Sequence, residues 1–423
     1  MCGTVSSDLC KYEEVNLKLR SHKLFPSASI TLAMILSLTG CSAATPNAGM
    51  STNEGSSMNA SKSVKDTTTN TSQTPDSNAT TSDQNSIVPP LASLQMVDSN
   101  TGWATGLKGK VWITTDGGKK WNNVTPKAIS TSSSTVVRMF GLDAKHSWIA
   151  VTSDSLRDNG IHPVAIFHTS DGGKSWSKQK FSGVGVPITL SFSNARDGSI
   201  ALTQGAAGGS EAETIYQTSD GGTTWTKAGF VNLYGGTLPF AGDKTGASFL
   251  DQTHGWATGY PVNGNVFLYR TEDAGQKWKG QTVIIPPNHL HQTNFVTYPP
   301  VFFNHQDGVL PTWVDTNPGT FLVFYTSDGG NTWKPTTSIT REVQGVESQD
   351  WSFPSSTNWF VTDDKQLLVT NNSGQTWSII TPNISFTKVS ALDFTSSSDG
   401  WILMSSGQTY HTTDGGHTWN KIT

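Results

Sequence analysis

The 423-residue sequence has few cysteines, few charged residues and no long apolar run. Its three cysteines are Cys2, Cys10 and Cys41, so no disulfide can form within the chain after Cys41. Only 14% of the residues are charged, and the formal net charge is −4. We expect no nucleic-acid partner, because the sequence has no basic stripe that could neutralise phosphates.

The one apolar stretch, residues 24–38, follows a short basic segment and is shorter than a membrane-spanning helix requires. This order predicts a secretion signal. The stretch ends in Leu-Thr-Gly-Cys at residues 38–41, which resembles a bacterial lipobox. The resemblance implies that residues 1–40 are a leader and that Cys41 is lipidated, so that the protein is extracytoplasmic and anchored to the cell membrane. The alternative is an ordinary signal peptide with a chance cysteine.

Residues 41–90 are dominated by Ser, Thr, Asn, Gly and Asp. Such a composition buries too little apolar surface to offset the entropy of ordering the chain. We expect a disordered tether that ends at Pro89 and Pro90, so that the folded domain comprises residues 91–423.

One eight-residue segment, here called the octapeptide turn, occurs seven times in residues 91–423. The first copy reads T-T-D-G-G-K-K-W at residues 114–121. The third positions of the seven copies are Asp116, Asp171, Asp220, Asp273, Asp328, Asn372 and Asp414. Their spacing of 42 to 55 residues is typical of propellers or solenoids.

The chemistry of the octapeptide turn explains its recurrence without a ligand. A short carboxylate can accept hydrogen bonds from the backbone of its own turn, the glycines allow positive φ, and the final Trp can pack as an apolar plug. The pattern resembles the Asp-box, or bacterial neuraminidase repeat, in which these acidic residues are structural. The sixth copy departs from it, because Asn372 replaces the carboxylate.

Each repeat also contains alternating or apolar segments that predict four short strands around the turn, including a marker of the type Gly-Trp in the second strand. Seven such units predict an all-β, seven-bladed propeller with four-stranded antiparallel blades. A linear solenoid competes, but both of its ends would require polar capping repeats. Seven of the fifteen tryptophans end octapeptide turns and five lie at the marker, so we expect these twelve in the core.

The marker and octapeptide turn, repeated seven times after a lipoprotein leader, are similar to the photosystem II stability and assembly factor family. The resemblance implies a scaffold, without catalysis or a cofactor, that binds a protein partner at or near the membrane during assembly; we expect a monomer. The alternative is a glycan-binding or glycoside-hydrolase-like propeller, since Asp-boxes also occur in sialidases and xyloglucanases. The sequence lacks the Arg-Ile-Pro motif of sialidases.

Long inserts point to the binding surface. They join the second strand to the third, or one blade to the next, and should therefore gather on the face opposite the octapeptide turns. The candidate partner-binding residues in these inserts are Tyr234, Tyr260, His289, His291, Trp313, Asp315, Arg341 and Glu342. Aromatic and arginine side chains dominate interface hot spots, although these residues could equally pack within their loops.

Two possible metal sites have weak sequence support. His289 and His291 could share one face of a strand, but no carboxylate lies at a known ligand spacing. Asp154, Asp158 and Glu211 could bind a cation, but they do not form a recognisable calcium loop. We expect no bound metal and no catalytic residue.

Overall fold

The computed structural model describes residues 89–422 apart from residues 131, 133–134, 154–161, 208, 262–265, 290, 292–293, 317, 342–349 and 364. The predicted leader, the lipidation site Cys41, the tether up to residue 88 and the candidate residue Glu342 lie outside the described residues. In the part of the chain that is described, no helix is long and apolar enough to cross a membrane.

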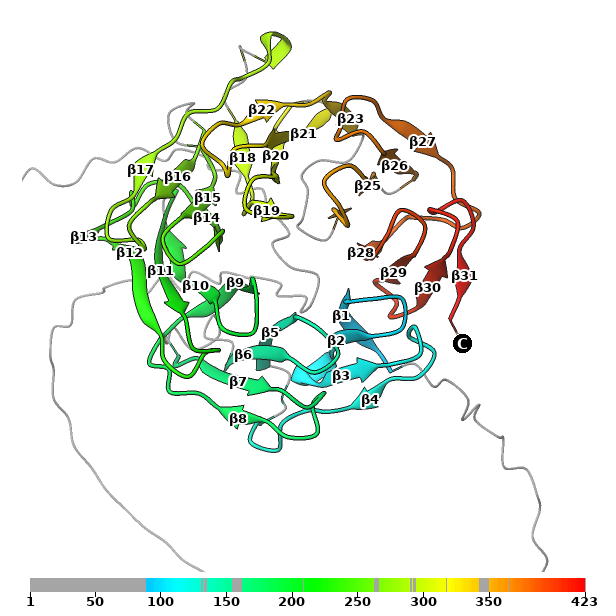
Figure 1. Cartoon of the computed structure of the whole chain (residues 1–423), viewed down its shortest axis with the longest axis horizontal. Coiled ribbons are helices and arrows are strands. Elements are labelled where there is room, and N and C mark those ends of the chain that lie inside the picture. The colour runs from blue at the N-terminus through cyan, green and yellow to red at the C-terminus, as the bar shows by residue number, and fades with distance from the viewer. Residues whose placement is uncertain are drawn as a thin grey trace, which may run out of the picture. The chain divides into compact units, whose positions relative to one another are not determined.

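The described residues form seven antiparallel sheets, each built from one contiguous stretch of chain (Figure 1). Blade 1 contains β1 (Leu91–Met96), β2 (Gly102–Gly106), β3 (Val111–Thr114) and β4 (Asn122–Asn123). Blade 2 contains β5 (Thr135–Gly141), β6 (Ser147–Ser153), β7 (Ala165–Thr169) and β8 (Ser177–Lys178). Blade 3 contains β9 (Val186–Phe192), β10 (Gly198–Ala207), β11 (Ser210–Thr218), β12 (Thr226–Asn232) and a fifth strand, β13 (Gly235–Gly236).

The remaining four blades follow in chain order. Blade 4 contains β14 (Lys244–Phe249), β15 (Gly255–Gly259), β16 (Leu268–Thr271) and β17 (Lys279–Gly280). In blade 5, β18 (Phe295–Thr297) and β19 (Val301–Phe302) pair with β20 (Gly308–Val314), while β22 (Lys334–Pro335) and β23 (Ile339–Arg341) pair with β21 (Gly319–Thr326). Blade 6 contains β24 (Trp351–Ser352), β25 (Trp359–Thr362), β26 (Leu367–Thr370) and β27 (Ser378–Ile380). Blade 7 contains β28 (Val389–Phe394), β29 (Gly400–Met404), β30 (Thr409–Thr412) and β31 (Asn420–Lys421).

The seven sheets are arranged radially around an axis, with the first strand of each blade innermost and the last outermost (Figure 1). This confirms the seven-bladed propeller with four-stranded antiparallel blades that the repeats predict. The second strands β2 and β15, both Gly-Trp-Ala-Thr-Gly, are buried at every position. Neighbouring blades cover both faces of these strands, so they do not alternate between apolar and polar residues.

Blade 6 departs from the marker register. Thr370 at the end of β26 pairs with Trp359, whereas the equivalent Thr114 in blade 1 pairs with Gly102. Phe360 therefore takes the position that the marker tryptophan has elsewhere. Because side chains alternate along a strand, the shift turns Trp359 toward the core between blades 5 and 6, while Phe360 enters the core with Phe394 of blade 7. Trp359 is still fully buried, but the assignment of five tryptophans to one marker position is wrong.

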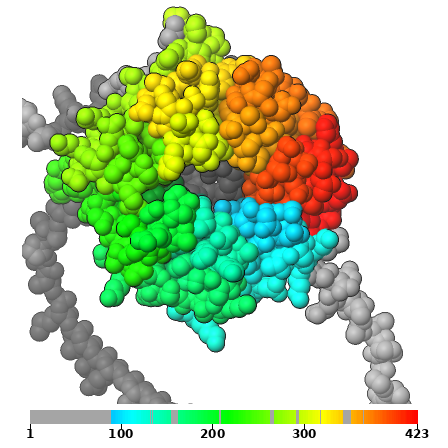
Figure 2. Space-filling model, in the orientation of Figure 1, coloured from blue at the N-terminus to red at the C-terminus, as the bar shows by residue number. Residues whose placement is uncertain are grey.

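The ring closes between blades 7 and 1 without a shared strand. Leu91, Leu94 and Trp121 of blade 1 form one buried cluster with Trp401 and Leu403 of blade 7. Figure 2 shows these first and last blades, in blue to cyan and in red, lying against each other. Two hydrogen bonds cross the seam. The Trp401 Nε1–H donates to the carbonyl of Gly117 at 3.0 Å, and the backbone N–H of Met96 donates to the Asp393 carboxyl. Packing between blades 7 and 1 therefore closes the ring.

The loops gather on two opposite faces. In each blade, the N–H at the fourth position of the octapeptide turn donates to a carbonyl in the turn between the first two strands, as Gly117 does to Asn100 at 2.8 Å and Gly221 to Arg196 at 2.8 Å. These two kinds of turn share one face, here called the turn face. Successive strands of a blade are antiparallel, so the second-to-third loops and the blade connections lie on the other face, here called the insert face.

Candidate functional site

Each octapeptide turn closes on itself through the hydroxyl of its first residue and the side-chain oxygen of its third residue. In the third turn, the Thr218 hydroxyl donates to Oδ1 of Asp220 at 2.8 Å and accepts from the backbone N–H of Gly222 at 2.9 Å. The Asp220 carboxylate also accepts from the backbone N–H and the hydroxyl of Thr224, at 2.9 and 2.6 Å. Both carboxylate oxygens are occupied within the turn, so the turn holds its shape without a ligand.

These hydrogen bonds lower the pKa of the carboxyl groups. The hydroxyl and backbone N–H of Ser175, followed by the Thr169 hydroxyl, lower the pKa of Asp171 to about 2. The hydroxyl and backbone N–H of Thr418 have the same effect on Asp414, whose pKa is also lowered to about 2. Both groups are ionised at neutral pH, so neither is suited to donate a proton in catalysis.

Asn372 reproduces the turn with an amide. Its Oδ1 accepts from the Thr370 hydroxyl at 2.9 Å and from the backbone N–H of Thr376 at 3.0 Å. Its Nδ2 donates to the Thr376 hydroxyl at 2.8 Å. The sixth turn therefore keeps the hydrogen bonds of the others with the donor and acceptor exchanged at one of them.

Replacing Asp220 with alanine should lower the free energy of unfolding by roughly 1 to 3 kcal/mol, because the backbone N–H of Thr224 loses its acceptor. Asn372→Asp is the matched change in another turn and should be neutral or mildly stabilising. Urea denaturation of both variants measures the difference. An Asp220→Ala protein that kept full stability but lost a ligand would show that these turns are binding sites.

The structure contains a second repeated turn that the sequence analysis missed. It joins the first two strands of every blade, and its first side chain accepts hydrogen bonds from the N–H groups two and three residues later. In blade 1, Oδ1 of Asp98 accepts from Asn100 at 2.8 Å and from Thr101 at 2.7 Å. The seven first residues are Asp98, Asp143, Asn194, Asp251, Asn304, Ser355 and Ser396. An Asp, Asn or Ser four residues before each second strand is the sequence signal that identifies it.

The structure brings three of the candidate binding residues into one cluster. Trp313 is 3% exposed and Arg341 is fully buried, with its guanidinium 5.9 Å from the Trp313 ring centroid. Nη1 of Arg341 lies 3.3 Å from Oδ2 of Asp350. Tyr260 is partly buried and packs against the same cluster. A partner of the folded ring cannot contact Trp313 or Arg341 directly, so these two residues support the surface and do not form it.

The two candidate histidines do not share a face. His289 lies in η3 (Pro287–His289), is 7% exposed, and has Nε2 at 3.1 Å from Oγ of Ser338. Burial lowers its pKa. His291 is exposed. Among the described residues, no group of three His, Cys, Asp or Glu side chains could hold a metal ion.

Glu211 and the buried Lys244 form a hydrogen-bonded cluster, here called the lysine clasp. The Glu211 carboxylate accepts from the Thr203 hydroxyl and from the backbone N–H of Lys244. Nζ of Lys244 donates to four backbone carbonyls, including that of Gly242 at 2.6 Å. Asp154 and Asp158, its two expected partners in a cation site, lie outside the described residues. The clasp fixes the connection between blades 3 and 4 on the insert face.

Tyr234 is the most exposed of the candidate residues. It lies at the tip of the β12–β13 hairpin, is 95% exposed, and follows Leu233, which is 74% exposed. Its backbone N–H donates to Oδ1 of Asn232 at 2.9 Å, which fixes the tip. The hairpin extends blade 3 at its outer edge (Figure 1). Asp315 is also exposed, in the insert-face loop after β20.

No tryptophan of the chain is exposed, and Tyr234 is the only exposed aromatic residue within the described part. The marker tryptophans Trp103, Trp148 and Trp256 are fully buried. Carbohydrate sites rely on exposed aromatic rings that stack on sugars, and the described surface offers no platform of such rings.

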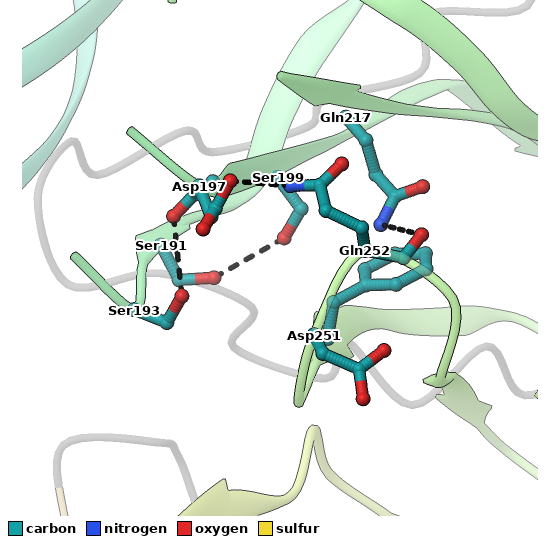
Figure 3. A pocket seen from close by; sticks show the side chains of 9 residues that line it. Ser191, Ser193, Asp197, Ser199, Gln217, Asp251 and Gln252 are labelled. Atoms are coloured by element: carbon teal, nitrogen blue, oxygen red, sulfur yellow. Dashed lines mark hydrogen bonds between the residues drawn. The ribbon is translucent and has the colours of Figure 1, made fainter. Parts of the chain in front are cut away.

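A shallow hollow of about 470 Å³ lies on the turn face between blades 3, 4 and 5. Asp197 and Asp251 line this hollow and also the smaller pocket beside it that Figure 3 shows, in which Gln252 Nε2 donates to Oδ1 of Asp197 at 2.8 Å. Burial acts to raise the pKa of Asp251, but hydrogen bonds from His254 and Thr253 outweigh it and lower this pKa to about 2. Asp251 therefore lacks the raised pKa that the general acid of a glycosidase requires.

One family profile matches part of the chain. A family profile described as photosynthesis system II assembly factor YCF48 matches residues 74–247, which include blades 1 to 3. Comparison with curated protein sequences gives no match.

Solved structures similar to parts of this chain include two of YCF48 and one of a GH74 enzyme. "YCF48 bound to D1 peptide" is 16% identical, with a TM-score of 0.46 over 78% of this chain and 93% of its own. YCF48 from Cyanidioschyzon merolae is 16% identical, with a TM-score of 0.45 over 76% and 92%. The GH74 enzyme of Niastella koreensis is 16% identical, with a TM-score of 0.53 over 78% of this chain, which spans about half (54%) of that enzyme. The chain is thus a seven-bladed propeller that resembles the YCF48 assembly factors over residues 74–247.

Proposed function

We propose that this chain is a protein-binding propeller that acts without catalysis in the assembly or maturation of a membrane-associated complex. The observation that carries the proposal is the β12–β13 hairpin, which presents Leu233 and Tyr234 to solvent on the insert face. An exposed leucine next to an exposed tyrosine on a hydrogen-bonded hairpin has the chemistry of an interface anchor. The hairpin also lies inside the segment that matches the assembly-factor profile.

The distribution of acidic groups favours binding over glycoside hydrolysis. The carboxyl groups with strongly raised pKa values are Glu213, to about 8, and Asp393, to about 7, in each case chiefly because of burial. Glu213 is fully buried, and Asp393 lies in the seam between blades 7 and 1. Glu213 therefore cannot contact a sugar on the surface, and the partly buried carboxyl of Asp393 is occupied by the hydrogen bond from the backbone N–H of Met96. The glycan-active alternative would therefore require carboxylates other than these two and Asp251.

The proposal includes an extracytoplasmic location and a lipid anchor at Cys41, supported by the lipobox-like residues 38–41. Cys41→Ser should release the protein into the medium or leave it with an uncleaved leader, since stable anchoring requires two or more acyl chains. Partitioning of the protein into a detergent phase measures this. Partitioning that the substitution leaves unchanged would contradict a lipidated cysteine.

Replacing Leu233 and Tyr234 together with serine should reduce partner capture at least tenfold, because hot-spot anchors contribute energy mainly to binding. The melting temperature should stay nearly unchanged, since both side chains are exposed. The measurement is affinity capture of the full chain from solubilised membranes, with the captured proteins quantified. Ile379→Ser is the matched control, because Ile379 is 62% exposed on the outer strand β27 of blade 6.

Two outcomes of this experiment would contradict the proposal. One is capture of the same proteins, in equal amounts, by the hairpin variant and the wild type. The other is release of reducing sugar from a β-glucan or sialylated substrate by the purified chain, if a single Asp or Glu substitution abolishes that release.

A further inference from the structure

The described loops on the insert face of blades 7, 1 and 2 carry charge of one sign. The described loops on this part of the face contain five lysines and no Asp or Glu; the lysines are Lys108, Lys110, Lys127, Lys180 and Lys388. None of their ammonium groups forms an ion pair with a described residue. The β6–β7 loop of blade 2 lies outside the described residues and is not included. We call these five residues the lysine rim.

The turn face has the opposite character. Carboxylates lie in six of its seven octapeptide turns and in several of the turns between the first two strands of a blade, here called the capping turns. The lysines of this face, such as Lys119 and Lys174, occupy the same turns as Asp116 and Asp171. The protein therefore has a net charge of −4 but a local excess of positive charge on one part of one face.

The chain enters the propeller inside the lysine rim. Pro90 precedes β1, and its carbonyl oxygen lies 3.1 Å from where a Cβ on Gly106 would be. Its Cα lies 3.6 Å from where a Cβ on Gly407 would be, in the β29–β30 turn of blade 7. That turn is bonded to Lys388 through the backbone N–H of Ser405, at 2.9 Å. Residues 1–88 therefore join the folded domain on the insert face, between blades 7 and 1.

An exposed apolar side chain lies at the same place. Leu107 follows Gly106 in the β2–β3 turn and is 58% exposed. Positive φ angles at Lys108 and Gly109, 60° and 74°, form the turn. A Cβ on Gly109 would lie 2.6 Å from Cγ2 of Thr135, so the turn packs directly on the inner strand of blade 2. Leu107 is thus held outward next to two lysines.

We propose that the lysine rim and Leu107 lie against an anionic membrane surface. Lysine ammonium groups are strongly hydrated point charges that suit a diffuse layer of lipid phosphates, whereas specific recognition of a carboxylate favours the bidentate geometry of arginine. The described rim contains no arginine. Each lysine near an anionic bilayer strengthens binding roughly fivefold. A leucine at the centre can enter the headgroup region.

The position of the chain entry argues for a membrane and against an acidic protein segment as the occupant. Pro90 lies beside Gly106 and Gly407, so an anchor in the preceding residues would keep this entry point, and the lysine rim around it, within reach of the bilayer. The Leu233–Tyr234 hairpin lies at the outer edge of blade 3 and contains none of the five lysines. The inference does not depend on the proposed protein-binding function or on the acylation of Cys41.

The test measures binding of the full chain to phosphatidylcholine vesicles with and without phosphatidylglycerol, in a Cys41→Ser background that excludes acylation. The test variant carries Lys108→Glu, Lys110→Glu, Lys127→Glu and Lys388→Glu. The control carries Lys119→Glu, Lys145→Glu, Lys174→Glu and Lys277→Glu, which make the same change in net charge on the turn face. The leader is identical in all proteins, so any difference in vesicle binding between them arises from the charges on the insert face or on the turn face.

We expect the wild type and the control to prefer the anionic vesicles, with binding that weakens as salt rises. The lysine-rim variant should lose that preference by about a hundredfold or more, with an unchanged melting temperature. Anionic vesicles should also slow amide exchange in residues 105–112 of the wild type. Equal loss in both variants, or no preference of the wild type for anionic vesicles, would overturn the proposal. So would protection of residues 105–112 by poly-glutamate but not by vesicles, which would identify an acidic protein segment as the occupant.

Discussion

Gly275→Ala should lower the free energy of unfolding by about 3 to 5 kcal/mol, one of the largest effects of any single methyl group in the ring. A Cβ on Gly275 would lie 1.4 Å from the carbonyl oxygen of Ala228 in the neighbouring blade. The backbone of Gly275 also has a φ of 82°, which disfavours any other residue. The indole N–H of Trp278 donates to the same carbonyl at 3.0 Å, so the carbonyl cannot move aside without losing that hydrogen bond.

A substitution at the preceding residue, Ala274→Gly, is the control, because it should not lower the stability. Ala274 has a φ of 59°, and glycine adopts this conformation without the steric penalty that alanine incurs. Ala274→Gly should therefore leave the stability unchanged or raise it by up to about 1 kcal/mol, because the entropy that glycine adds to the unfolded chain offsets part of the gain. Thermal and urea unfolding compare the two variants. A Gly275→Ala protein as stable as the wild type would contradict the close contact between blades 3 and 4.

Stability should fall as the pH rises from about 4 to about 7, because of Asp393. Burial raises the pKa of this carboxyl from its ordinary 3.8 to about 7, although the hydrogen bond from the Met96 N–H acts to lower it. Between these two values the folded protein holds a proton on Asp393 that the unfolded chain has released, so the contribution of Asp393 to the free energy of unfolding decreases with pH in this window and levels off above it. Glu213, whose pKa burial raises to about 8, extends the fall to about that pH in the wild type and in any Asp393 variant alike. The strands packed on β28, namely β1, β24, β25 and β29, contain no charged residue that could offset the effect.

Asp393→Asn isolates this contribution, since an amide oxygen can still accept from Met96 but does not titrate. The variant should exceed the wild type in stability by about 1 to 3 kcal/mol at pH 8 and match it near pH 4. Ser352→Ala is the control, because the Ser352 hydroxyl makes the corresponding link from blade 6 to Phe394 of blade 7 and carries no charge. Its effect should not change with pH. Parallel pH profiles of the wild type and Asp393→Asn would refute a protonated carboxyl at the seam.

The repeats predict the architecture because each blade is a local unit. The octapeptide turns set the number of blades, and the strands on either side of each turn lie within the same contiguous segment of chain. In blade 6, which lacks the Gly-Trp pair of the marker, the predicted strand pairing is wrong by one residue at Trp359. The tryptophan alone does not fix the register of the second strand. The capping turns do not form a visible sequence repeat, because Asp, Asn and Ser can each supply the acceptor at their first position.

The surface was harder to predict than the fold, because exposure depends on contacts between distant residues. Arg341 is buried because β23 returns to pair with β21, which places Arg341 beside Gly319 and over Trp313. Nothing in the local sequence distinguishes Arg341 from an exposed loop arginine. Tyr234 is exposed because the hairpin that carries it extends beyond the outer edge of its blade. The five lysines of the lysine rim lie in separate loops, and only the blade topology places these loops on one face.

The central claim, that the insert face binds a protein and the octapeptide turns are structural, is tested most directly by photocrosslinking in the cell. A photoreactive residue is placed at Tyr234 on the insert face or at Lys119 on the turn face, both of which are exposed. The claim predicts a covalent adduct with a defined protein from position 234 and none from position 119. An adduct from position 119 alone would place the partner on the turn face and contradict the claim.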